Sequence, residues 1–362
     1  MSELRPVPAD AWDNLARGFA DHSYRQLSAY SNACNDRFGA RSERVALYDD
    51  QGTAIAASEV RIKAVPGIGS GLAYASAGPL CRRAEATDEE SLDAMRSMLV
   101  AMREAYAERR SLILRVQCPL GPEEWNSASQ AVLRELGFGP SDYPRAYRTI
   151  CIDTRPSLDG IRASFHKGWR KMLRRGETRG LEAEVGDGPE LFAAATELHR
   201  ALMDRKGFTV ELDAGFYERV QERLVGDDRM TMIVVRSEGE IVGMNLVSAL
   251  GDTLAGIVGA STATGAKLSG AYLLEWMAIE LAHERGLRCY DMGGFDPDDN
   301  PGVADFKRRT GGADISSAGP AQFVPSGVRP RIAQSLESAV RRVRRARRER
   351  GQRAAENAGE AA

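Results

Sequence analysis

The sequence predicts an α+β protein of two domains, each a mixed, twisted sheet flanked by helices, followed by a basic C-terminal helix. Three observations support this prediction. The chain has 362 residues, whereas single domains commonly hold about 100–200. Hydrophobic residues make up 43% of the chain, which is enough to fill two cores. A similar order of helical and strand patterns runs through both halves, more clearly in the second.

In the first half, helical patterns alternate with short strand patterns. A pair of strands is joined by the turn Asp49–Gly52. A later helix stops at Gly137, since glycine adopts the left-handed conformation that often ends a helix. The expected helices are Asp10–Gly18, Tyr24–Arg37, Glu89–Arg109 and Glu124–Leu136, and the expected strands are Arg44–Tyr48, Ala54–Ala64, Leu112–Val116 and Tyr147–Ile152.

The second half reads as a strand, two helices, three strands, a helix and a strand. The later helix places Leu274, Met277 and Ala278 on one face, as an amphipathic helix requires. We expect strands at Leu181–Val185, Met230–Arg236, Glu240–Ala249, Thr253–Gly259 and Leu287–Met292, and helices at Pro189–Arg205, Ala214–Leu224 and Gly270–Arg285. The predicted domains are 1–152 and 153–320, and 321–362 holds a closing strand and the basic helical tail.

Composition narrows the classes of function. No run of 18 apolar residues exists, so no membrane-spanning segment is expected, and the polar N-terminus lacks a secretory signal. The cytoplasm is therefore the expected compartment. The five cysteines and four histidines are scattered without a CxxC pair, which favours buried free thiols over disulfides or zinc. The acidic loop Asp296–Asp299 has Lys307 where a calcium loop needs a carboxylate, so neither a metal nor a cofactor is expected.

Charge is distributed unevenly. The net charge is −2, but Val328–Arg350 holds nine arginines and two glutamates, a local charge of +7. The remainder therefore carries about −9, which is −2 minus +7. The basic tail can contact RNA phosphates, or it can be a solvated, frayed helix.

The segment Tyr290–Gly312 has the most specific pattern. A buried strand ends at the pair Gly293-Gly294, an acidic loop follows, and a short helix with Phe306 and Lys307 leads to a second glycine pair. Glycine pairs allow a backbone to approach a ligand closely or to adopt positive φ. We therefore expect a substrate site here, with Tyr290, Asp291, Gly293 and Gly294 among its residues.

Arginines supply candidate phosphate-binding groups in the second half. Six lysines and arginines lie between Lys167 and Arg179. Arg170, Arg174 and Arg205 are the candidates, because guanidinium groups suit phosphate through paired donors. The alternative is a solvated helix face.

The segment Tyr290–Gly312 resembles the signature of the Fem family, in which a strand ending YDFGG precedes an acidic loop with NPG, then FK and GG. The preceding helix, Arg170 with Arg174, and Gly207-Phe208 are also similar to family patterns, and the resemblance spans roughly Asp10–Pro325. It implies two GNAT-like domains that move an amino acid from aminoacyl-tRNA to an amine of a nucleotide-linked or lipid-linked muropeptide. The order of elements in the second half is also that of the GNAT fold.

By the same resemblance, Phe306 and Lys307 occupy the catalytic positions. A fixed cation there can stabilise the oxyanion that forms when an amine attacks an ester, or neutralise the neighbouring phosphate. The alternative is one charge among Lys307, Arg308 and Arg309 on a solvated face.

The sequence departs from the family at three positions. Ala77 replaces an arginine, Cys118 replaces an acidic residue before Pro119, and Met292 replaces a phenylalanine. The second departure leaves the general base open between Asp291, water and the substrate itself.

Other functions remain open from the sequence. One is an acyl-CoA N-acyltransferase, although Thr264–Ala271 lacks the usual glycine spacing of a pyrophosphate cradle. Others are a tRNA-dependent aminoacyltransferase of secondary metabolism and a non-catalytic RNA-binding or scaffold pair. The long coiled-coil arm of some Fem proteins has no counterpart here, which predicts a compact monomer.

Overall fold

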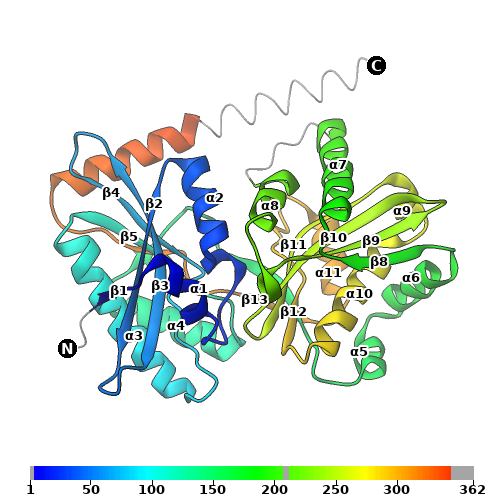
Figure 1. Cartoon of the computed structure of the whole chain (residues 1–362), viewed down its shortest axis with the longest axis horizontal. Coiled ribbons are helices and arrows are strands. Elements are labelled where there is room, and N and C mark those ends of the chain that lie inside the picture. The colour runs from blue at the N-terminus through cyan, green and yellow to red at the C-terminus, as the bar shows by residue number, and fades with distance from the viewer. Residues whose placement is uncertain (1–3, 207–211, 344–362) are drawn as a thin grey trace.

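Helices and strands form two lobes that lie side by side (Figure 1). The computed structural model describes residues 4–206 and 212–343, excluding the side chains of Arg205 and Lys206. Each lobe is built on one mixed sheet with flanking helices, which confirms the predicted α+β class. No helix among the described residues is long and apolar enough to span a bilayer.

The first sheet has seven strands in the order β1-β2-β3-β4-β5-β14-β6. Only β4 and β5 pair in parallel, because a helical crossover separates them in sequence. The strands are β1 (Arg5–Pro6), β2 (Arg41–Tyr48), β3 (Ala54–Val65), β4 (Ser70–Ser76), β5 (Leu112–Gln117), β6 (Gly139–Pro140) and β14 (Ala321–Phe323). Sequence analysis missed β4, whose small residues lack the β-branched enrichment of its neighbours.

The second sheet also has seven strands, in the order β13-β7-β12-β11-β10-β9-β8. Again one pair, β11 with β12, is parallel and the others are antiparallel. The strands are β7 (Arg148–Asp153), β8 (Glu182–Gly186), β9 (Thr231–Ser237), β10 (Glu240–Leu250), β11 (Thr253–Ser261), β12 (Cys289–Asp291) and β13 (Ala313–Ser316).

Helices cover the faces of both sheets (Figure 1). A capping box between Thr87 and Glu90 begins α3, and Asn300 with Pro301 begins α11. The helices of the first lobe are α1 (Ala9–Ala16), η1 (Tyr24–Gln26), α2 (Ser28–Phe38), α3 (Asp88–Met102), η2 (Arg103–Glu108) and α4 (Glu123–Glu135). Those of the second are α5 (Leu158–Ser164), α6 (Lys167–Thr178), α7 (Pro189–Lys206), α8 (Ala214–Gln221), η3 (Gly226–Asp228), α9 (Ala263–Lys267), α10 (Gly270–Glu284) and α11 (Pro301–Arg308). Residues 328–343 form a further helix on the first lobe.

The chain crosses between the lobes twice, before β7 and before β14. β7 hydrogen-bonds in the second sheet between β12 and β13, and β14 returns to the first sheet between β5 and β6. The boundaries 1–152, 153–320 and 321–362 remain predictions, but β7 pairs with the second sheet rather than the first. The physical reason is its packing, since Ile150 and Ile152 belong to the hydrophobic core of the second lobe.

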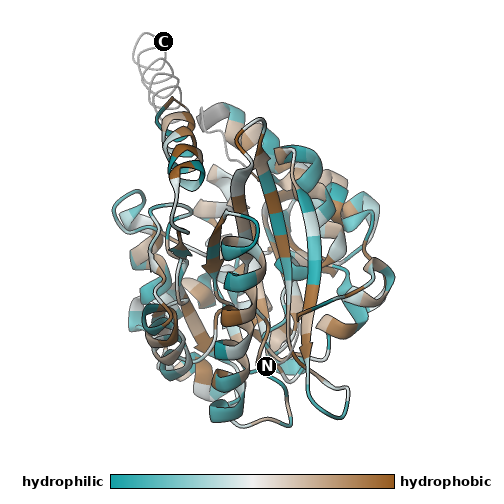
Figure 2. Cartoon of the chain, turned by 90° about the vertical axis from the view of Figure 1, so that its left-hand side faces the viewer, coloured by the Kyte–Doolittle hydropathy of each residue, from teal (hydrophilic) through white to brown (hydrophobic). Residues whose placement is uncertain are grey.

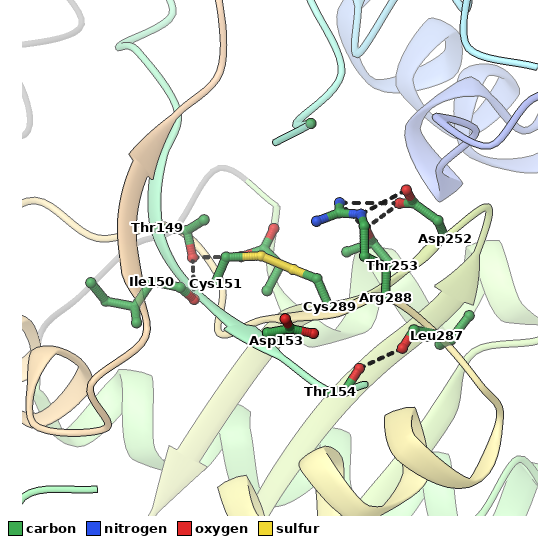
Figure 3. The surroundings of a disulfide bond; sticks show 12 residues. Thr149, Ile150, Cys151, Asp153, Thr154, Asp252, Thr253, Leu287, Arg288 and Cys289 are labelled. Carbon is green, nitrogen blue, oxygen red and sulfur yellow. Dashed lines mark hydrogen bonds and ion pairs between the residues drawn. A yellow bond between two sulfur atoms is a disulfide. The ribbon is translucent and has the colours of Figure 1, made fainter. Parts of the chain in front are cut away.

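The expectation of free thiols throughout is wrong for two of the five cysteines. Cys151 on β7 and Cys289 on β12 form a disulfide across 138 residues of sequence (Figure 3). Sequence spacing could not reveal this bond, because only the antiparallel pairing of β7 with β12 brings the two residues together. Cys34, Cys81 and Cys118 are free and buried, as expected.

The lobes share a hydrophobic core and charged contacts. Tyr30 of α2 stacks on Tyr217 of α8 with ring centroids 6.5 Å apart. Asp228, whose side chain is 5% exposed, pairs with Arg17 at 2.6 Å. These contacts fix the position of one lobe against the other.

Candidate functional site

The candidate site begins where two parallel strands separate. β11 and β12 pair only from Thr253 opposite Cys289 to Ala255 opposite Asp291. β12 then ends, while β11 continues to Ser261. The turn Met292–Gly294 fills the start of this opening, since Gly256 of β11 lies against the backbone of Asp291 and Met292.

Lys307 lies beneath that turn. Its residue is 8% exposed, and its Nζ donates to the carbonyl oxygens of Met292 and Gly293, both at 2.7 Å. A third contact, to the carbonyl of Gly294, is longer at 3.5 Å. Burial lowers the pKa of Lys307, and the nearby carboxylates of Glu275 and Asp291 oppose that shift. The alternative of a solvated lysine is therefore wrong, whereas Arg308 and Arg309 are exposed.

Asp291 is held on the other side of the same turn. It is 4% exposed and accepts hydrogen bonds from the hydroxyls of Tyr147 at 2.7 Å and Thr149 at 2.5 Å. The Gly293 N–H also donates to it at 2.9 Å. Since Lys307 also binds the carbonyl of Met292, the Met292–Gly293 peptide connects the carboxylate with the ammonium.

Both glycines of the first pair meet protein atoms. Gly293 has φ +82°, and a Cβ there would lie 2.9 Å from the carbonyl oxygen of Gly256. A Cβ at Gly294 would lie 3.0 Å from the ring of Tyr147. Internal packing therefore requires glycine at position 293 and favours it at position 294.

Tyr290 takes part in an internal network. It is fully buried, its hydroxyl donates to Glu275 at 2.5 Å, and it accepts from Asn245 at 3.0 Å. Burial raises the pKa of Glu275. Tyr290 thus supports α10 against the sheet and does not line either of the two cavities described next.

The larger cavity is an open groove of about 770 Å³ between α6, the start of α10 and α11. Three aromatic rings form one wall: the centroid of Tyr272 is 5.1 Å from that of Trp169 and 5.0 Å from that of Phe306. The cations that line the groove are Lys171, Arg174, Arg175, Arg179 and Arg309. We call this cavity the basic groove.

The predicted phosphate-binding arginines fall in different places. Arg174 lines the basic groove and, within the described chain, forms no ion pair. Arg170 instead donates to the carbonyls of Ala163 at 2.5 Å and Phe165 at 2.8 Å, where it closes the turn between α5 and α6. The side chain of Arg205 lies outside the described residues.

The smaller cavity, about 60 Å³, lies between the lobes, and we call it the interlobe pocket. Asp291, Tyr147 and Cys118 line it, together with Asp21 and Arg25. Burial raises the pKa of Asp21 to about 7, despite backbone hydrogen bonds that favour its charged form. Four polar atoms here are buried and have no partner within the described chain: His22 Nε2, Ser23 Oγ, Ser248 Oγ and Ser317 Oγ.

Sequence reasoning missed Asp21 and Arg25. The guanidinium of Arg25 lies 4.9 Å from the ring centroid of Tyr147. Neither residue belongs to a motif, and only the packing of the lobes brings them to Asp291. The sequence held one signal. Cys118 replaces an acidic residue of the family pattern, and its thiol lines the same pocket as the carboxyl of Asp21.

Taken together, the carboxylate of Asp291 lines the interlobe pocket and Phe306 lines the basic groove. The ammonium of Lys307 lines neither cavity but is bound to the turn that follows Asp291. Such an arrangement can bind two substrates and neutralise negative charge where they meet. Among the described residues, no cluster of three or more histidine, cysteine or acidic side chains is placed to hold a metal ion.

Comparisons with known proteins agree with a GNAT-like fold. Residues 163–308 match the acetyltransferase (GNAT) domain family. A crystal structure of FemX is similar over 93% of this chain and 99% of that one, with a TM-score of 0.74 and 16% identity. A sequence comparison with curated proteins finds no match.

Two further solved structures are more distant. L-PGS from Bacillus licheniformis is similar over 93% of this chain and 97% of its own, with a TM-score of 0.54 and 14% identity. A conserved protein of unknown function from Bacteroides thetaiotaomicron has a TM-score of 0.53 and 13% identity over 87% of this chain and 97% of its own. The chain therefore has a tandem GNAT-like fold similar to that of FemX, as its sequence predicted, and the match of residues 163–308 supports an acyltransferase.

Proposed function

We propose that this protein transfers an amino acid from aminoacyl-tRNA to an amine, with a nucleotide-linked or lipid-linked peptidoglycan precursor as the acceptor. The observation that carries the proposal is the buried ammonium of Lys307, which is held against the turn that follows Asp291. Asp291 lines the interlobe pocket, and Phe306, the neighbour of Lys307 in sequence, lines the basic groove. The FemX-like fold is consistent with this reaction. We further propose that the protein acts in the cytoplasm as a monomer, without a cofactor or a metal.

The donor would occupy the basic groove. A tRNA 3′ end carries phosphates and unstacked bases, which bind respectively to arginines and to aromatic faces. Arg174 and Phe306 offer one group of each kind. The aminoacyl ester would then lie at the end of the groove nearest Lys307.

The acceptor amine would enter from the interlobe pocket. Attack on the ester carbonyl places a negative charge on its oxygen, and the positive charge of Lys307 would stabilise it. Asp291 is one candidate for taking the amine proton, and Asp21 is a second because its pKa lies near neutrality. Tyr290, Gly293 and Gly294 would shape the site without contacting the reacting atoms.

A second candidate is an acyl-CoA N-acyltransferase. It is favoured by the match of residues 163–308 to the acetyltransferase domain family. The same groove can bind the phosphates of either donor, so the donor must be distinguished by assay.

The test is a turnover assay with a panel of charged tRNAs and, separately, acyl-CoA thioesters, against amine acceptors that include nucleotide-linked muropeptides. We expect transfer from at least one aminoacyl-tRNA and none from acyl-CoA. Transfer from acyl-CoA alone would establish the second candidate. No transfer with either donor across the panel would support a non-catalytic role.

Lys307→Ala tests the proposed charge. We expect kcat to fall by about 100-fold or more, as for the loss of one oxyanion-stabilising donor. Arg308→Ala is the matched control, because Arg308 is adjacent but exposed and pairs with Asp314. Thermal unfolding must accompany the assay, since Lys307 also binds two buried carbonyls. A folded Lys307→Ala protein with unchanged kcat would exclude the proposed role.

A further inference from the structure

The helix of residues 328–343 exposes an apolar stripe. Among the described residues, nine large hydrophobic side chains are exposed, and five of them belong to this helix. They are Val328 at 72%, Ile332 at 41%, Leu336 at 44%, Val340 at 52% and Val343 at 53%. Their spacing of three or four residues places them within one face of an α-helix.

A neighbouring face of the helix fixes it to the first lobe. Arg115 of β5, with a side chain 2% exposed, binds both carboxylate oxygens of Glu337 at 2.7 and 2.9 Å. Pro330 and Ala333 are also buried. This attachment leaves the stripe exposed. The helix lies at the top of the first lobe in Figure 1, and Figure 2 shows hydrophobic residues along it.

Exposed arginines accompany the stripe. Arg329, Arg331 and Arg342 are exposed on the described part of the helix. The sequence from Val328 to Arg350 carries +7, against about −9 for the rest of the chain. An apolar face with adjacent arginines is the composition of helices that lie in the interface of anionic membranes.

We propose that this helix binds the surface of a bilayer that contains anionic lipids. The aliphatic stripe would enter the boundary between headgroups and acyl chains, and the arginines would contact lipid phosphates. An RNA partner would not cover five aliphatic side chains. Pairing of this helix with the same helix of a second copy would bring two clusters of arginines together, which repel each other.

Flotation with vesicles tests the proposal on the full chain. Vesicles of phosphatidylcholine alone are compared with vesicles of phosphatidylcholine and phosphatidylglycerol at about 70:30 in buffer of low salt. We expect at least about tenfold stronger binding to the anionic vesicles, weakened by high salt because charge attraction is screened. If the wild-type chain binds neither type of vesicle, the proposal is wrong, whatever any variant does.

A double variant tests the role of the stripe. Ile332→Ser with Leu336→Ser should reduce vesicle binding about tenfold or more, since the apolar contact is lost. Val225→Ser is the matched control, because Val225 is 74% exposed on the other lobe. Unfolding curves verify that both variants fold. Unchanged vesicle binding by the double variant would overturn the proposal. The proposal would also be overturned if the wild-type chain sedimented as a dimer in solution and the double variant as a monomer. That result would assign the stripe to a second copy.

Discussion

At the scale of single residues, the site depends on Gly293. Gly293 donates its N–H to Asp291 and accepts from Lys307 through its carbonyl. A positive φ and close contact with Gly256 allow this residue to lie between the two charged groups. Glycine is therefore needed here for backbone geometry, independently of any ligand.

Substitution of Gly293 tests this conclusion. Gly293→Ala should destabilise the protein more than Gly286→Ala, although both glycines have positive φ, of +82° and +64°. A Cβ at position 286 would have no neighbour within 4 Å. The only cost there is that of holding an alanine at positive φ, roughly 1–2 kcal/mol. At Gly293 the Cβ contact at 2.9 Å adds to that cost. Urea unfolding measures both, and equal losses would show that the close contact is relieved without cost.

At the scale of elements, the disulfide joins two central strands of the second sheet. Cys289 lies two residues before Asp291, so the bond attaches the strand that carries the carboxylate to β7 (Figure 3). Cys289 is 1% exposed and Cys151 6%, which shields the bond from reductants. Disulfides are common in oxidising compartments, so its redox state in the cell also bears on the proposed cytoplasmic location.

Thiol counting tests the disulfide. Alkylation of the unfolded, unreduced protein should label three cysteines, because Cys34, Cys81 and Cys118 are the free ones. Reduction should then lower the free energy of unfolding by about 2–4 kcal/mol, since a long loop is released in the unfolded chain. The variant Cys151→Ala with Cys289→Ala is the control, as its stability should not respond to reductant. Labelling of all five would show that the bond does not form.

At the scale of the whole molecule, the lobes are joined at several places. Asp252 of the second lobe accepts from Arg82 of the first at 3.2 Å and from Arg288 at 2.8 Å. The N–H of Asp252 also donates to the carbonyl of Ala20 at 2.8 Å. The walls of the interlobe pocket are thus fixed by contacts between residues far apart in sequence.

Arg17→Ala tests the coupling of the lobes. It leaves the buried carboxylate of Asp228 without its partner, so we expect a loss of about 2–3 kcal/mol, somewhat below that for a fully buried pair. Calorimetry should still show one transition, at a lower temperature, because both lobes share a core. Arg155→Ala is the control: its pair with Asp153 is exposed and should contribute less than about 1 kcal/mol. Two separate transitions in the wild type would contradict this view.

Local pattern determined much of the fold. Helix α10 was predicted within a residue from its amphipathic spacing, and the bounds expected for β9 and β10 also differ from the observed ones by no more than one residue. Lys307 and Phe306 were predicted as site residues because the glycine pairs and the family signature are contiguous in sequence. These features rest on interactions between near neighbours, which sequence periodicity records.

Only the tertiary structure decided the rest. The pairing of Cys151 with Cys289, the membership of β7 in the second sheet and the approach of Asp21 to Cys118 all join segments that no local pattern connects. The tertiary structure also distinguished the roles of two arginines: Arg174 lines the basic groove, whereas Arg170 closes a turn. The physical reason is that burial and long-range pairing depend on how the whole chain packs, whereas spacing reports only which face of an element a residue occupies.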